Sequence, residues 1–143
     1  MLTVFVDSSV LFAMCASATG AARELAKRAV RGRVTLAISD YVFEETETHL
    51  VEKAPRALRA FRYLQKRPFW LVVEVTRREV TTAEPVTSDV FDAPIVAAAK
   101  KVRADVLVTF DRRHLLNQRV ASYIGGVVVT PGQLLKTLRA MEE

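Results

Sequence analysis

The chain has 143 residues, half of them hydrophobic and 26% charged, which indicates a globular protein with a single domain over residues 1–143. Its one cysteine, Cys15, excludes an internal disulfide and fits a reducing cytoplasm, and its longest uncharged apolar stretch, "SSVLFAMCASATGAA", is too short and too diluted to span a membrane. A net charge of +5 and a pI of about 9.7 favour an acidic partner, with nucleic acid as the first candidate.

The first half of the chain alternates short apolar runs with longer amphipathic patterns. Residues 2–6, "LTVFV", predict a buried strand, which starts so early that no secretory leader is expected before it. Residues 20–32 predict an amphipathic helix that ends at a glycine, and residues 34–39 predict a second strand. Two further helices are expected to follow, over residues 40–53 and 55–66.

The second half continues the alternation. A third strand is expected at residues 70–75, and a polar stretch follows it over residues 76–91. The remaining expected elements, in chain order, are a helix at 93–103, a strand at 105–110, a basic loop at 111–119, a strand at 126–130 and a helix at 131–141 entered through Pro131.

Strands that are apolar on both faces and separated by helices predict a parallel sheet with helices on each side. The expected fold class is therefore α/β, a three-layer sandwich around a central, mostly parallel, Rossmann-like sheet. The carboxyl ends of the strands form the ligand crevice in such sheets. Asp7 and Asp111 each follow a predicted strand, so we expect both carboxylates on the same rim.

Three acids at the ends of elements can be explained singly or as one site. Asp7 can cap a helix that begins at Ser8, Asp92 can cap the helix 93–103, and Asp111 can start a turn. As a group, they can instead share the crevice, because Asp92 opens the helix that leads into the strand before Asp111.

Clustered carboxylates repel one another unless a cation neutralises them. Mg²⁺ and Mn²⁺ are hard ions that prefer oxygen ligands, whereas zinc prefers nitrogen and sulfur. His49 and His114 lack the spacing of a zinc site. An acidic cluster therefore suggests Mg²⁺ or Mn²⁺.

The helix predicted at residues 40–53 offers three glutamates. If its apolar residues face inward, Glu44 points farthest outward, while Glu45 and Glu47 flank the apolar stripe. Helical periodicity does not choose between Glu45 and Glu47, and all three are also consistent with a solvated acidic face.

Two groups of basic residues are candidates for phosphate binding. Four cations recur at helical spacing within residues 53–67 and form one stripe: Arg56, Arg59, Arg62 and Lys66. This stripe is either a solvated helix face or a track for a phosphate backbone. Arg112 and Arg113 directly follow Asp111 and are the better candidates for substrate binding, because they lie on the predicted rim.

Four segments in order, "VFVDSSVLF", "SDYVFEET", "FDAPIVAAA" and "ADVLVTFD", resemble the motifs of the PIN-domain family of metal-dependent ribonucleases. That family includes toxins of prokaryotic toxin–antitoxin pairs, the VapC type. The resemblance spans essentially the whole chain, down to the late "VVVTPGQLL".

The resemblance implies a catalytic site in which four acids bind one or two Mg²⁺ or Mn²⁺ ions: Asp7, Glu45, Asp92 and Asp111. Ser9 and Thr109 match positions whose hydroxyl or amide groups support the acids, although the family often has Asn where Ser9 stands. Asp89 is an additional acid that ranks below Asp92.

The resemblance implies an Mg²⁺- or Mn²⁺-dependent endoribonuclease that hydrolyses RNA phosphodiesters. The family includes both toxins of toxin–antitoxin pairs and related standalone proteins, and the resemblance leaves both roles open. The location expected from the single cysteine is the cytoplasm. A small antitoxin protein and a homodimer are compatible with the resemblance. One alternative is a non-catalytic module that binds RNA or a protein partner. A phosphoryl-accepting domain is less favoured, because the dehalogenase pattern requires Asp where Ser9 stands.

Overall fold

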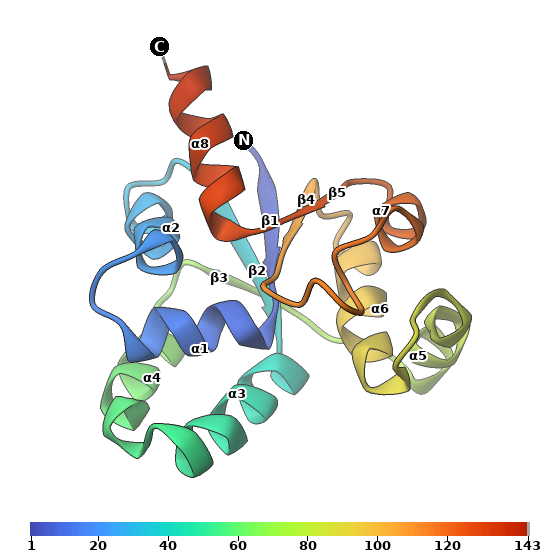
Figure 1. The fold of residues 1–143 in the computed structure, drawn as a ribbon, viewed down its shortest axis with the longest axis horizontal. Helices are drawn as coiled ribbons and strands as arrows, with labels where there is room; N and C mark the ends of the chain where they lie inside the picture. The colour runs from blue at the N-terminus through green and yellow to red at the C-terminus, as the bar shows by residue number, and fades with distance from the viewer. Residues whose placement is uncertain (143) are drawn as a thin grey trace.

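The computed structural model describes residues 1–142. Within them, one sheet of five parallel strands has the order β3-β2-β1-β4-β5 (Figure 1). In chain order the strands are β1 (Thr3–Val6), β2 (Thr35–Ser39), β3 (Trp70–Val73), β4 (Val106–Val108) and β5 (Val127–Val129). The expected α/β class with a central parallel sheet is confirmed.

Helices cover both faces of the sheet (Figure 1). The helices that follow β1, β2 and β5 lie together on one side: α1 (Ser8–Ala16), α2 (Ala21–Val30), α3 (Asp40–Lys53), α4 (Leu58–Gln65) and α8 (Pro131–Met141). The other side carries α5 (Arg77–Ala83), α6 (Ala93–Lys101) and α7 (Gln118–Ile124). The helices change sides because crossovers between parallel strands are right-handed. Strands are added from β1 to β3 in one direction and then from β1 to β5 in the other, so the connecting helices lie on opposite faces.

Three helices differ from the sequence expectation. The helix α1 was predicted only as one alternative, in which Asp7 caps a helix that begins at Ser8. Because α1 is apolar on all sides, the sequence shows no amphipathic stripe there. α5 occupies part of the predicted polar stretch, where only Ala83 of the helix is buried and a capping box between Thr76 and Glu79 sets the start. α7 begins inside the predicted basic loop, capped by the Asn117 side chain.

Local chemistry explains how the last elements join the sheet. A side chain at Gly126 would place its Cβ 2.6 Å from the Asp105 carbonyl oxygen, so glycine allows β5 to approach the start of β4. The helix α8 then begins with a capping box between Thr130 and Gln133 around Pro131.

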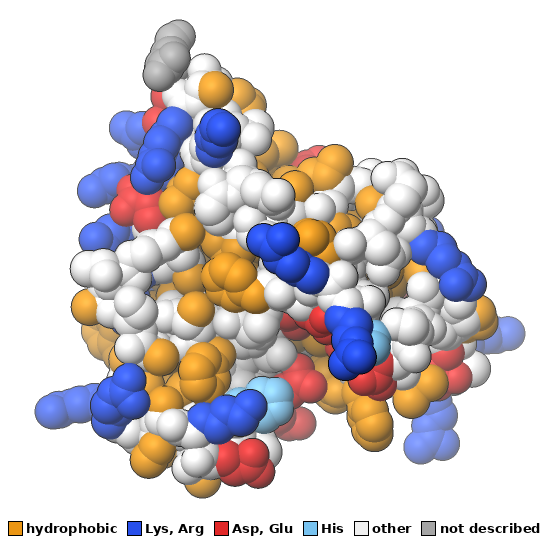
Figure 2. Space-filling view, in the orientation of Figure 1, with side chains coloured by type: hydrophobic (Ala, Val, Ile, Leu, Met, Phe, Trp, Pro, Cys, Tyr) orange, Lys and Arg blue, Asp and Glu red, His pale blue; other side chains and the backbone are white. Residues whose placement is uncertain are grey.

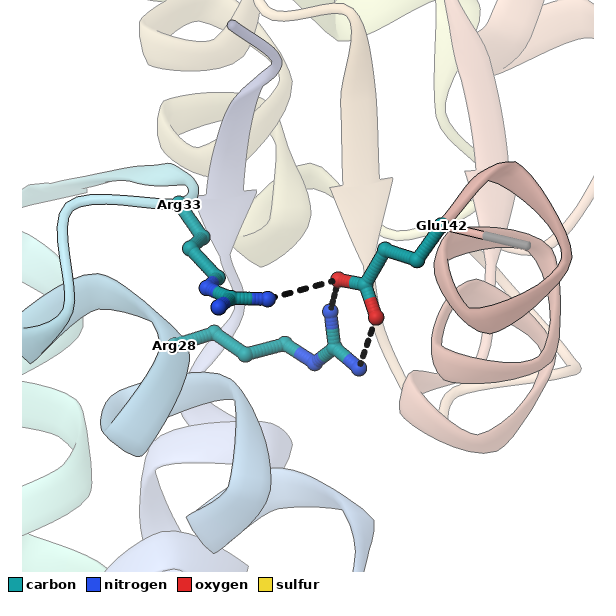
Figure 3. A network of polar contacts seen from close by, with 3 residues as sticks. All are labelled: Arg28, Arg33 and Glu142. Atoms are coloured by element: carbon teal, nitrogen blue, oxygen red, sulfur yellow. Dashed lines mark hydrogen bonds and ion pairs between the residues drawn. The ribbon is translucent and has the colours of Figure 1, made fainter.

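The end of α8 is fastened to the α2–β2 region by an ion-pair network (Figure 3). Glu142 accepts from both terminal nitrogens of Arg28, and Arg33 Nη1 lies 3.6 Å from the same carboxylate. Because Arg28 is only 7% exposed, this contact is screened less than a surface pair.

The core contains Cys15, as expected, and burial raises the pKa of its thiol to about 12. No helix within residues 1–142 is long and apolar enough to cross a membrane.

Candidate functional site

Four predicted acids belong to segments at the carboxyl rim of the sheet. Asp7 follows β1, and Asp111 lies shortly after β4, the strand that pairs with β1. Between these two strands the chain reverses its direction of winding, and such switch points are where open α/β sheets bind ligands. Glu45 comes from the start of α3, directly after β2, and Asp92 precedes α6.

Asp7 is 3% exposed and is held by two hydroxyl groups. Ser9 Oγ and Thr109 Oγ1 each donate to Asp7 Oδ2 at 2.7 Å. The same hydroxyls accept backbone N–H groups, Ser9 from Phe110 at 3.0 Å and Thr109 from Asp111 at 2.9 Å. Ser9 and Thr109 therefore link the end of β1 to the segment after β4 and orient the Asp7 carboxylate.

Tertiary contacts distinguish the three glutamates of α3. Ser8 Oγ donates to Glu45 Oε1 and lies 3.4 Å from Asp7 Oδ1, so Ser8 bridges Glu45 and Asp7. Glu47 instead accepts from Arg62 on α4 at 2.6 Å, and Glu44 is exposed. Glu45 faces the acidic centre, whereas Glu47 forms an ion pair with Arg62, one of the four cations of the predicted basic stripe.

Asp92 does not act as the N-cap that its sequence position allows. Among the hydrogen bonds of residues 1–142, none to its side chain caps α6, and its buried Oδ2 has no partner. Asp89 takes the capping role instead, since its Oδ1 accepts from Phe91 N at 3.0 Å and opens the short 3-10 helix Val90–Asp92.

The electrostatics of Asp92 show that the acids share one environment. Burial, followed by the negative charges of four carboxylates, raises the pKa of Asp92 to about 7. In order of effect, the four are Asp111, Asp7, Asp89 and Glu45.

Asp111 combines a turn with a place at the centre. Its Oδ1 accepts from the backbone N–H groups of Arg113 and His114, both at 3.0 Å, so the expected turn is present. Its charge is nevertheless the strongest electrostatic influence on Asp92. Figure 2 shows acidic side chains gathered around a hollow in the lower half of the view, with basic side chains on both sides.

A family model described as "PIN domain" matches residues 3–113. The chain belongs to the PIN-domain family. No curated protein matches it.

Two solved structures support the PIN fold. VapC20 of Mycobacterium tuberculosis, described as a sarcin-ricin loop cleaving toxin, is 24% identical and has a TM-score of 0.60 over 77% of this chain and 91% of that chain. PAE2754 from Pyrobaculum aerophilum is 25% identical, with a TM-score of 0.65 over 97% of this chain and 98% of that chain.

The PIN site contains two polar residues that the sequence analysis did not single out, Ser8 and Tyr41. Tyr41 Oη donates to the Phe91 carbonyl oxygen at 2.8 Å and lies 3.5 Å from Glu45 Oε2. Burial, and then the neighbouring Glu45, raises the pKa of Tyr41 to about 12, so the phenol keeps its proton at neutral pH. Tyr41 and Glu45 are four residues apart on α3, and this spacing places both side chains on one face of the helix. The sequence could therefore have indicated their contact.

The donor set of the PIN centre suits a hard divalent ion, since every acid supplies oxygen. Within the described chain, no group of three or more His, Cys, Asp or Glu side chains has the geometry of a formed metal site. The unpartnered Asp92 Oδ2 and its raised pKa nevertheless show negative charge that the protein itself does not neutralise. The residues therefore fit a cation in chemistry, although the carboxylates have to adjust to bind it.

The predicted substrate-binding arginines lie beside this centre. Arg112 and Arg113 are exposed, and neither forms an ion pair with another residue in the range 1–142. His114 joins their loop to the segment before α6, because its Nδ1 lies 2.7 Å from Ser88 Oγ.

Proposed function

We propose that this PIN domain is an Mg²⁺- or Mn²⁺-dependent endoribonuclease that hydrolyses RNA phosphodiesters. The observation that carries the proposal is the buried, unpartnered Oδ2 of Asp92, which lies among mutually repelling carboxylates at the switch point of the sheet.

Asp7, Glu45, Asp92 and Asp111 would hold one or two ions. A bound Mg²⁺ or Mn²⁺ ion lowers the pKa of coordinated water and stabilises the negative charge that develops on the phosphate. Attack of water on phosphorus then breaks one P–O ester bond and yields a phosphate monoester and a free hydroxyl group.

The residues of the chain contribute position and charge to this reaction. Ser9 and Thr109 orient Asp7, and Ser8 holds Glu45 toward it. Arg112 and Arg113 carry exposed positive charges beside the acids, where they attract the flanking phosphates.

The toxin role is part of the same proposal. It is supported by family membership and by the fold shared with VapC20, which is described as a sarcin-ricin loop cleaving toxin. We further propose a cytoplasmic location, a small antitoxin protein as partner, and a homodimer as the assembled form.

A cleavage assay on single-stranded RNA and single-stranded DNA tests the proposal. The parent chain should cleave RNA with Mg²⁺ or Mn²⁺ and lose activity in EDTA, and Asp7→Asn and Asp92→Asn should be inactive with either ion. Glu44→Gln is the matched control, because Glu44 is an exposed carboxylate of α3 that is not among the charges acting on Asp92. Cleavage that persists in EDTA or in both Asn variants rejects the proposal.

A further inference from the structure

Two phenylalanines flank the acidic centre and are exposed. Phe91 directly precedes Asp92 and is 70% exposed, and Phe110 directly precedes Asp111 and is 45% exposed. The other five of the seven phenylalanines lie in the core or pack against it: Phe5, Phe12, Phe43, Phe61 and Phe69. The fold therefore buries every phenylalanine wholly or in part, except the two that adjoin acids of the centre.

The backbone of both exposed residues is anchored to the polar network of the centre. The Phe91 N–H donates to Asp89 Oδ1 at 3.0 Å and its carbonyl oxygen accepts from Tyr41 Oη at 2.8 Å. The Phe110 N–H donates to Ser9 Oγ at 3.0 Å. Each ring is thus presented to solvent from a fixed backbone position, which lowers the entropy lost when a ligand stacks on it.

We propose that Phe91 and Phe110 are stacking platforms for unpaired nucleobases next to the phosphodiester at the acidic centre. This rests on the proposed nuclease function and assigns two substrate-contacting residues in addition to the acids and the arginines. An aromatic ring stacks on the face of any base, and these faces are accessible in single strands but covered in a duplex. The neighbouring Arg112 and Arg113 supply the positive charge that a nucleic acid requires, which favours this occupant over an apolar protein surface.

Binding without cleavage tests the proposal. Fluorescence anisotropy in EDTA would compare a labelled, non-self-complementary RNA strand with the same strand in a duplex. The parent should bind the single strand more tightly. Phe91→Ala and Phe110→Ala should each weaken single-strand binding about tenfold, and leave duplex binding unchanged.

Matched substitutions separate stacking from general apolar contact. Phe91→Tyr and Phe110→Tyr keep a ring and should retain binding, whereas Phe91→Leu and Phe110→Leu should behave like the alanine variants. Val30→Ala is the surface control, because Val30 is 69% exposed and ends α2, which leads into the amino end of β2, whereas the acids follow the carboxyl ends of the strands. The proposal is overturned if leucine substitutes for phenylalanine, if Val30→Ala has the same effect, or if the parent binds the duplex as well as the single strand or binds neither.

Sedimentation of the same variants tests a second copy of the chain as the occupant. If Phe91→Ala or Phe110→Ala dissociates an oligomer, these rings form a contact between copies, and the stacking assignment is wrong. An unchanged oligomeric state together with weakened single-strand binding supports it. Binding is measured without metal, so it is independent of cleavage. If the phenylalanine variants bind the single strand as tightly as the parent while the parent still cleaves RNA, only the stacking inference is rejected. If the variants bind the single strand more weakly but the parent shows no metal-dependent cleavage, only the nuclease proposal is rejected.

Discussion

Three small hydroxyl side chains determine how the carboxylates of the centre are oriented. Ser9 and Thr109 both donate to Asp7 Oδ2, and Ser8 donates to Glu45. These bonds orient the Asp7 and Glu45 carboxylates before any ligand binds, which lowers the cost of reorganising these two groups when a ligand arrives. These hydrogen bonds distinguish the side chains that reach the acidic centre from neighbouring side chains of the same type.

Glu45 and Glu44 differ in this way. Glu45→Gln should lower the RNA cleavage rate by at least about 100-fold, because it removes a negative charge that faces the centre. Glu44→Gln should leave the rate nearly unchanged, since Glu44 is exposed. Initial rates on one labelled RNA measure both variants, and an inactive Glu44→Gln protein would show that the helix register assigned to catalysis is wrong.

Asp92 should make the metal-free protein less stable as the pH rises. Its pKa is about 7 in the folded chain, above the ordinary value of 3.8 for an aspartate, so the folded state holds the proton more tightly. The resulting stability is fully present below about pH 4 and is lost as the pH rises through 7. Asp92→Asn removes this dependence and should stabilise the chain at pH 8 by about 1 kcal/mol, allowing for solvent screening of a half-buried group. Thermal unfolding in EDTA at pH 5 and pH 8 measures the effect.

The same two proteins respond differently to metal. A hundredfold excess of Mn²⁺ over its dissociation constant stabilises the parent by about 2.7 kcal/mol, and Asp92→Asn should gain much less. A parent whose melting temperature ignores both Mn²⁺ and Mg²⁺ contradicts the metal site.

At the scale of elements, the acidic centre depends on how α3 meets the segment before α6. Tyr41 in the first turn of α3 donates to the carbonyl group of Phe91, one residue before Asp92. A second contact, between Ser88 and His114, joins that segment to the loop after β4. These two hydrogen bonds set the position of Asp92 relative to Glu45 and Asp111.

Tyr41→Phe tests this link while keeping the ring. We expect about 1 kcal/mol lower stability, the typical value of one hydrogen bond, and about tenfold slower cleavage through a lower kcat. KM should change little, because the phenol orients the acids and does not bind the RNA backbone. Steady-state kinetics and denaturant unfolding measure the two effects, and a change confined to KM would assign Tyr41 to substrate binding instead.

At the scale of the whole molecule, charge is unevenly distributed. The chain carries a net charge of +5, yet five of its 16 acidic residues gather at one rim. In the proposed function the cations next to that rim attract RNA, while other cations serve the fold: Arg62 binds Glu47, and Arg28 and Arg33 hold the end of α8 (Figure 3). Net charge alone therefore does not identify the residues that contact a nucleic acid.

Arg112→Ala combined with Arg113→Ala should weaken RNA binding and flatten its salt dependence. Loss of two phosphate contacts on a single strand lowers the slope of log K against log salt by about 1.4. Lys136→Ala with Arg139→Ala removes the same charge from exposed positions on α8 and serves as the control. Titrations at several salt concentrations measure the slopes, and equal slopes in both double variants would remove the two arginines from the RNA path.

The sequence by itself determined the sheet and the rim. Apolar runs of strand length, separated by helical patterns, require a parallel sheet covered on both faces, and this brings Asp7 and Asp111 to one edge. These signals are local in the chain, so they can be read without knowing any contact. The helix α5 was not predicted and α1 was predicted only as an alternative, because neither has an amphipathic stripe: α1 is apolar on all sides, and α5 is mostly exposed.

Only the tertiary structure decided which polar groups meet. Ser8 selects Glu45 across 37 residues, Tyr41 reaches Phe91 across 50, and Thr109 reaches Asp7 across 102. Local rules made Asp92 a good helix cap, yet its Oδ2 is buried without a partner among residues 1–142 because folding surrounds it with other carboxylates. Periodicity specifies which face of an element is buried, but the partner on that face is set by packing between segments far apart in the chain.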